Sequence, residues 1–234
     1  MGIRLAMLLL FLCSTLSWGG FVQAATVTYL VKPAQVKQSG MEVWQALRLG
    51  DSVDQGDAIR TGIGGRVEIE IDHKRHLRIA EATEITLSVL TGQTDTLRAR
   101  IGLLGGRFWG SLRLPLQTKN NEQFQVSTST AVIGVKGTSF GLDFDKTTQI
   151  AQVAVLSGWV SIHPGESALA PPTQIEGPRE VAPPQQITKA EWFRLVSQGE
   201  YMVIQPGKIP TVKLLTDEMK QDPWIQFNRE RDAL

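Results

Sequence analysis

Apolar and polar residues alternate along most of the chain, and this period of two is the feature that most constrains the fold. In "RVEIEID" (66–72) every second side chain is apolar and those between are charged. The same alternation recurs at 76–80, 84–90, 96–101, 124–128, 139–144 and 150–156. Such segments are typical of strands with one buried face. Glycines and Gly-Asp pairs separate them at short intervals, so the sequence predicts an all-β domain of many short strands.

Two segments suggest how these strands are arranged. "LLGGRFWGSL" (103–112) and "VLSGWVSI" (155–162) both run from apolar residues through glycine into aromatic and apolar residues. They resemble two strand–turn–strand corners in one coiled sheet. We therefore expect a β-solenoid-like or sandwich-like domain without the fixed period of a true repeat protein.

The composition changes after His163. Residues 164–187 hold six prolines and predict an extended Pro-rich linker. In the tail, 188–234, we expect helical and extended structure. One short helix is predicted from Thr188, its N-cap, to Gly199. A last helix is predicted to begin at Asp222-Pro223, where proline suits the first helical position.

The first 24 residues have the pattern of a signal peptide. Arg4 gives a positive start, an apolar run follows, and Val22-Gln23-Ala24 is a small-x-small cleavage site. Cleavage near Ala24 would leave the β domain at 25–163 and place the protein in the periplasm or outside the cell, with no membrane span. The alternative is that this segment is kept as an anchor, since its apolar stretch is nearly long enough to span a bilayer.

Charge and cysteine content exclude several classes of function. Without residues 1–24, 23 basic and 23 acidic side chains remain, so no basic excess is available for nucleic acid. Cys13 is the single cysteine and lies within the predicted signal peptide. Disulfides are therefore not expected in the mature protein, and its stability must come from burial.

Residues 137–141, "GTSFG", match the G-x-S-x-G pattern of a hydrolase nucleophile elbow. That motif needs a strand, a sharp turn at the serine and then a helix. Here the residues after Gly141 alternate like a strand, and His163 is the one histidine downstream of Ser139. We expect the glycines to serve as bends in the backbone and Ser139 not to be a nucleophile.

Other candidate chemistry is equally sparse. His73 and His76, with Asp72, fit a solvated hairpin turn better than a metal site, because Lys74 and Arg75 would repel a cation. "GIGG" (62–65) is followed by strands and not by a helix, unlike a dinucleotide-binding loop. Glu68 and Glu70 share one face of a strand, which we expect to be the solvated face. We therefore assign no catalytic residue, no metal ligand and no cofactor.

The tryptophans allow one further hypothesis. Trp44, Trp109, Trp159, Trp192 and Trp224 are the side chains from which a carbohydrate platform could be built. Trp109 and Trp159 each follow a turn glycine within a strand, so core or corner positions are the favoured interpretation for those two.

Three motifs, in order, resemble the FecR domain family over about residues 47–162. The family pattern begins with Gly-Asp and Arg-Thr-Gly, continues with Arg-Gly-Thr-x-Phe, and closes with Val-x-Val-x-x-Gly-x-Val. Lys136 stands where arginine is usual. The matching residues are Gly56, Asp57, Arg60, Thr61 and Gly62, then Lys136, Gly137, Thr138 and Phe140, and finally Val153, Val155, Gly158 and Val160.

The resemblance implies a role in protein–protein interaction. The iron-dicitrate regulators of this family carry a cytoplasmic anti-sigma segment, one membrane span and this domain in the periplasm, where it contacts the signalling domain of an outer-membrane receptor. Here an uncleaved anchor would leave only residues 1–4 in the cytoplasm, too few to hold a sigma factor. We therefore expect an exported, non-enzymatic binding module whose protein partner lies in the envelope.

Two alternatives remain open. One is a periplasmic sensor component of a FecR-type relay, working through a receptor or a separate membrane regulator. The other is an envelope polysaccharide-binding protein that uses the tryptophans. For the fold, the motifs predict a backbone corner at Gly137 and buried side chains at Phe140, Val153 and Val155.

Overall fold

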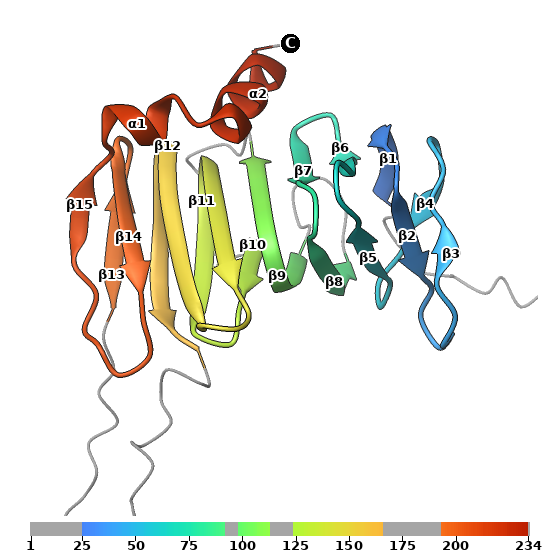
Figure 1. Cartoon of the computed structure of the whole chain (residues 1–234), viewed down its shortest axis with the longest axis horizontal. Coiled ribbons are helices and arrows are strands. Elements are labelled where there is room, and N and C mark those ends of the chain that lie inside the picture. Colours follow the sequence, from blue (N-terminus) through green and yellow to red (C-terminus); the bar gives the residue numbers. More distant parts are fainter. Residues whose placement is uncertain (1–24, 92–97, 113–123, 166–192, 234) are drawn as a thin grey trace, which may run out of the picture.

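The computed structural model describes residues 25–91, 98–112, 124–165 and 193–233 (Figure 1). The predicted signal peptide, most of the Pro-rich linker and Trp192 lie outside these residues. The described chain is mostly strand, with two short helices near the C-terminus, which confirms the predicted fold class. The strands are β1 (Ala25–Val31), β2 (Ala34–Lys37), β3 (Gln45–Ala46), β4 (Ser52–Val53), β5 (Ala58–Thr61), β6 (Arg66–Asp72), β7 (Arg75–Ile79), β8 (Glu84–Thr91), β9 (Arg98–Leu112), β10 (Phe124–Ser127), β11 (Ala131–Asp145), β12 (Ile150–Pro164), β13 (Arg194–Ser197), β14 (Glu200–Ile204) and β15 (Val212–Leu214). The helices are α1 (Asp217–Lys220) and α2 (Pro223–Asp232).

These strands belong to one sheet that doubles back into two facing layers. Layer A runs β4–β1–β6–β7–β9–β11–β12–β14–β15. Layer B runs β3–β2–β5–β8–β9–β10–β11–β12–β13. The three 15-residue strands β9, β11 and β12 belong to both layers, because each pairs with one set of neighbours through its first half and another through its second. The arrangement is sandwich-like.

Each long strand changes layer at a glycine. In the first half of β9 the odd-numbered side chains face the core, and beyond Gly106 the even-numbered ones do; β11 and β12 switch in the same way around Gly137 and Gly158. These glycines have φ values of 100°, 62° and 73°, a left-handed backbone that side chains disfavour. The bend and the change of parity together keep the apolar side chains between the layers.

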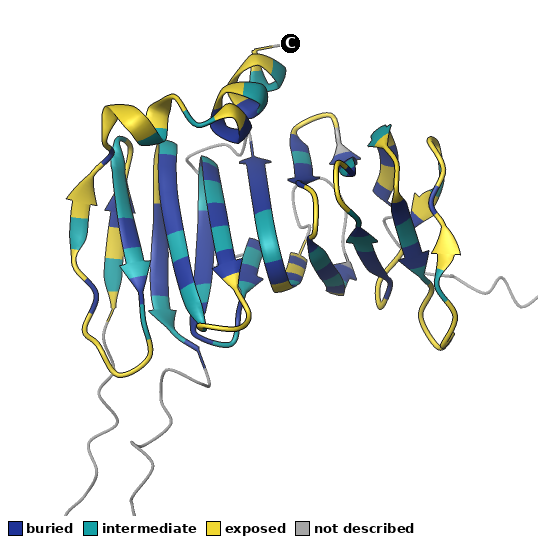
Figure 2. Cartoon of the chain, viewed as in Figure 1, coloured by how far each residue is buried: buried dark blue, intermediate teal, exposed yellow. Residues whose placement is uncertain are grey.

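One continuous apolar core fills the space between the layers. In Figure 2 buried residues, whatever their type, are dark blue on the ribbon. Phe108 of layer A packs against Phe140, with ring centroids 5.9 Å apart. Phe140, Val153 and Val155 are each fully buried, as the alternation predicts. The core is held by side chains from both halves of every long strand, so the layers cannot separate without exposing it.

The C-terminal residues extend the sheet and then cover part of it. β13 continues layer B, while β14 and β15 continue layer A. The short helix predicted from Thr188 to Gly199 is wrong over the described residues, because 194–197 form β13. Val196 pairs with Val160 and enters the core, and this long-range contact overrides the local helical pattern. The last helix begins as predicted, with Asp222 as the N-cap of α2.

Candidate functional site

The first motif of the sequence forms a tight turn and its anchor. Gly56 has a φ of 92°, and its backbone N–H donates to Leu87 O at 2.7 Å. The Asp57 carboxylate is buried and accepts from the backbone N–H groups of Ser39 and Asp54, at 2.8 and 3.0 Å. These hydrogen bonds fix the backbone at the start of β5, and each carboxylate oxygen accepts one of them.

Arg60, Thr61 and Gly62 tie β5 to the segments beside it. Thr61 Oγ1 donates to Ala80 O at 2.5 Å and accepts from the Thr83 N–H at 3.0 Å. Arg60 Nε donates to a glutamine of β2, and its guanidinium lies 4.2 Å from the centre of the Trp44 ring. A side chain at Gly62 would collide with Pro33. Each of these groups makes contacts within the fold.

The second and third motifs meet where β11 and β12 change layer. A Cβ atom at Gly158 would collide with the Gly137 carbonyl oxygen. Thr138 Oγ1 donates to Trp159 O at 2.7 Å, which joins the two strands at the bend. Val160 is fully buried, and Lys136 is half-buried. The motif residues therefore build the corner that the sequence predicts.

Ser139 lies inside β11, which continues as a strand to Asp145. Its backbone N–H donates to Ser157 Oγ at 3.1 Å. His163 is paired with Val132, near the opposite end of β11, and its ring packs on Phe193 with centroids 5.0 Å apart. The strand–turn–helix geometry of a nucleophile elbow is thus replaced by one long strand, and the fold does not bring Ser139 and His163 together.

The histidine-bearing segment is the hairpin between β6 and β7, as the sequence predicts. His73 is fully exposed, and its Nδ1 lies 3.0 Å from Glu70 Oε1. Among the residues that the structure describes, no three His, Cys, Asp or Glu side chains gather in a group able to hold a metal ion.

Glu68 corrects one expectation. The sequence predicts a solvated face for Glu68 and Glu70, yet Glu68 is only 5% exposed, because α2 packs over it. Arg78 pairs with Glu68 across β6 and β7, and Arg231 of α2 donates to both carboxylate oxygens at 2.9 Å. Thr28 of β1 adds a fourth hydrogen bond at 3.0 Å. Alternation placed Glu68 on the outer face correctly but could not show what covers that face.

A second carboxylate completes this network. Asp232 of α2 lies 2.5 Å from Arg78 Nη1 and accepts from Trp109 Nε1 at 3.1 Å. Trp109 is fully buried beneath the helix, where it packs against the buried side chains of α2, Trp224 and Ile225. The outer face of layer A therefore presents two charges and an indole N–H, each with a partner on α2.

The other end of α2 is also fixed by charge. Asp222 caps the helix by accepting from the N–H groups of Trp224 and Ile225, and it also accepts from Arg107 Nη2 at 3.0 Å. Arg107 Nε donates to Asp143 on the neighbouring strand at 3.1 Å. Both ends of α2 are thus attached to layer A by ion pairs.

Burial and charge act in opposite directions on the pKa values here. Burial by itself would raise the pKa of Glu68, but hydrogen bonds from Arg231 and Arg78 outweigh it and lower the pKa to about 2. At Asp143 burial prevails over Arg107, and the pKa is raised. At Asp222 burial is outweighed by the hydrogen bond from Arg107 and by those from the backbone N–H groups of Ile225 and Trp224, and the pKa is lowered. Glu68 is therefore an anion at any neutral or mildly acid pH.

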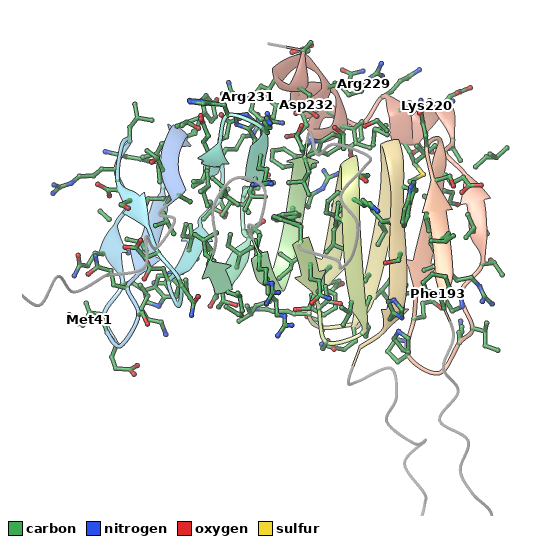
Figure 3. All side chains as sticks on the ribbon, turned by 180° about the vertical axis from the view of Figure 1, so that it is seen from behind. Met41, Phe193, Lys220, Arg229, Arg231 and Asp232 are labelled. Atoms are coloured by element: carbon green, nitrogen blue, oxygen red, sulfur yellow. The ribbon has the colours of Figure 1, made fainter. Side chains whose placement is uncertain are left out.

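The outer face of layer B differs because it exposes large apolar side chains near β13. Trp159, Phe193 and Leu195 are 38, 49 and 51% exposed. The register places Leu195 opposite Ser161, and Trp159 and His163 lie two residues to either side of Ser161 on the same face of β12. We call Trp159, Phe193 and Leu195 the Trp159 patch. In Figure 3 Phe193 lies at the lower rim of the sandwich, away from α2.

Sequence comparison identifies the middle of the chain. Residues 57–161 match the FecR family, described as FecR protein. Those residues form a FecR domain. The match falls within the region over which the three motifs resemble that family and confirms the resemblance. It begins at Asp57 and ends at Ser161, so the FecR domain spans β5 to most of β12.

Solved structures show weaker similarity. Two crystal structures of a protein described as an anti-sigma factor from Parabacteroides distasonis match with TM-scores of 0.47 and 0.43 and identities of 15 and 14%. The first covers 72% of this chain and 64% of its own, the second 65% and 56%, so this chain spans less than two thirds of either. At this level they carry no argument about function. No curated protein sequence matches the chain.

The described tryptophans of the FecR domain and its flanks do not share one surface. Trp109 is buried beneath α2, where it packs with Trp224 of that helix, whereas Trp44 is stacked with Arg60. Trp159 lies at the corner that Gly158 makes, as predicted, but it keeps 38% of its surface exposed and is therefore not a core residue. Its side chain points out of layer B because the change of parity at Gly158 turns Val160 inward.

The described residues contain no helix that is long and apolar enough to cross a membrane. The segment for which an anchor was considered, residues 1–24, lies outside them.

Proposed function

We propose that this protein is an exported, non-catalytic signalling component of FecR type that binds an envelope protein through the Trp159 patch. The FecR domain supplies the family context. The observation that carries the proposal is the exposure of Trp159, Phe193 and Leu195 at the outer face of layer B, along β12 and β13. Tryptophan and other large apolar side chains that are exposed as a group are typical of the centre of a protein interface.

The patch lies beside an edge that can accept another strand. Within the described chain, β13 pairs with β12 and forms the edge of layer B. At the opposite end of layer B the edge strand β3 has only two residues. An extended segment of a partner can pair along β13 and place alternate apolar side chains against Leu195 and Trp159, as in strand addition to an open sheet.

Charge defines the partner further. Lys136 is paired with Trp159 across β11 and β12, and Arg194 begins β13. Lys136 shares the outer face of layer B with Trp159, so the partner segment is expected to combine apolar with acidic side chains. The partner class proposed is a receptor or a membrane regulator in the envelope, which is the sensing alternative of the sequence analysis.

Site-specific photo-cross-linking in intact cells tests this function. A photoreactive amino acid replaces Leu195 in the full chain, and a second protein carries it at Val43, an exposed apolar position that is 67% exposed. Cross-linking to a membrane protein from position 195 alone, and its loss in a Trp159→Asp variant, is the expected result. Equal cross-linking from both positions, or recovery of cytoplasmic proteins only, would contradict the proposal.

Export is tested separately. A fusion of residues 1–30 to alkaline phosphatase, which is active only after export, should give active enzyme. Mass spectrometry of the purified protein should then find the N-terminus near Ala25. An inactive fusion would reject the proposed location without bearing on the Trp159 patch.

A further inference from the structure

The outer face of layer A carries a continuous row of outward-facing residues across five strands. Glu68, Arg78, Trp109, Gly141 and Ala154 are successive cross-strand neighbours on β6, β7, β9, β11 and β12. The row begins with two charges, passes through an indole and ends in two small residues. We call this row the α2 groove, because α2 lies along it.

α2 matches the groove at both ends. Its C-terminal Arg231 and Asp232 meet Glu68 and Arg78, each with a partner of opposite charge. Its first turn, with Trp224 and Ile225, lies over the small residues Gly141 and Ala154, where a large side chain would obstruct the helix. The groove therefore selects a helix by charge at one end and by shape at the other.

The packing of α2 against the groove is incomplete. Of its ten residues only Trp224, Ile225 and Asn228 are buried. Within the described chain, Trp224 Nε1 is buried without a hydrogen-bond acceptor, which costs free energy. A cavity of about 70 Å³ remains beside it, between the helix and layer A. A helix of this length is marginal on its own, so its contacts with the groove decide whether it stays in place.

We propose that the α2 groove is a helix-binding site that α2 occupies as an intramolecular ligand. The partner that it fits is a short amphipathic helix with an aspartate at its N-cap, a tryptophan in its first turn and an Arg-Asp pair in its last turn. Such a helix, presented by another protein, takes the groove when α2 leaves it. The groove and the Trp159 patch lie on opposite layers, so this surface is independent of the one in the proposed function.

A peptide of residues 215–233 serves as the probe, labelled for fluorescence anisotropy and added to the full chain. In Arg231→Ala/Asp232→Asn protein the resident helix loses its two groove charges while the peptide keeps them. Arg229→Ala is the matched control, because Arg229 is exposed on the same helix (Figure 3). Hydrogen exchange of residues 224–232 reports whether α2 is released.

The double variant should lose protection of α2 and bind the peptide at least tenfold more tightly than wild-type or Arg229→Ala protein. A peptide carrying the same two substitutions should not bind. Release of α2 without peptide binding would overturn the proposal, because the groove would then not recognise a helix in trans. Unchanged protection of α2 in the double variant would overturn it as well.

Wild-type protein offers a test if the double variant does not fold. Amides of α2 should exchange through an opening that leaves β6, β7 and β9 protected. Exchange of α2 only together with those strands would show that the helix never leaves the groove by itself, and would reject the proposal.

Discussion

Arg231 and Glu68 are 163 residues apart in the chain and form a two-pronged hydrogen bond, with Nε and Nη2 of the arginine each 2.9 Å from a carboxylate oxygen. This geometry is the strongest arrangement available to an arginine and a carboxylate. It joins the last turn of α2 to β6, the third strand of layer A counted from the edge strand β4. This pair of hydrogen bonds holds α2 over the outer face of layer A.

Glu68→Gln should lower the free energy of unfolding by about 3 kcal/mol, because it removes the anion that two arginines share in a buried site. Glu70→Gln is the matched control, since Glu70 lies two residues along the same strand face with its side chain 25% exposed. Its effect should stay within about 0.5 kcal/mol. Equal urea midpoints for the two variants would show that burial of Glu68 has no energetic consequence.

Acid should weaken the attachment of α2. The pKa of Glu68 is about 2 in the folded protein, against 4.5 for the ordinary side chain. The native state therefore binds this proton less tightly than the unfolded state, and the stabilisation is complete above about pH 4.5 and lost as the pH falls toward 2. Urea unfolding across this range should show a steeper loss of stability for the wild-type protein than for Glu68→Gln. Parallel curves would contradict the assignment.

Gly158→Ala should destabilise the corner between the layers by about 1–3 kcal/mol, because it adds a collision with Gly137 O to an unfavourable φ. Gly40→Ala separates the two causes, since Gly40 has a similar φ of 76° but no atom within 4 Å of the added Cβ. The control should lose about 1 kcal/mol. Thermal unfolding measures both, and an equal loss would attribute the whole effect to backbone conformation.

Phe140→Ala should cost about 3–5 kcal/mol, since Phe140 is fully buried against Phe108 and its ring also lies against Gly110, its partner on the neighbouring strand β9. Leu142→Ala, at an equally buried site on the same strand, should cost about 2–5 kcal/mol. Urea midpoints near that of the wild type would show that this part of the core is not well packed.

Leu195→Asp should leave the free energy of unfolding within about 0.5 kcal/mol of the wild type, because Leu195 is half exposed and points out of layer B. In a protein that carries the photoreactive amino acid at position 159, the same change should abolish the cross-link to the envelope partner. Val196→Asp, one residue along, should unfold the protein, since Val196 is buried. A Leu195→Asp protein that cross-links as well as the wild type would remove the Trp159 patch from the interface.

Local pattern was sufficient for much of this fold. The alternation of apolar and polar residues identified the strands of the FecR domain, because successive side chains of a strand point to opposite faces. Glycines at 137 and 158 predicted corners, since few other residues adopt their backbone conformation. The start of α2 followed from Asp222-Pro223, whose capping chemistry acts within one turn.

The sequence by itself determined which side chains share a face, where the backbone bends and that the three FecR motifs are present. Only the tertiary structure decided what lies against each face. Glu68 and Glu70 have the same alternation, yet α2 covers the first, and residues 194–197 became a strand because β12 offered them an edge. The physical reason is that alternation is a property of neighbouring residues, whereas burial depends on segments that are distant in the chain.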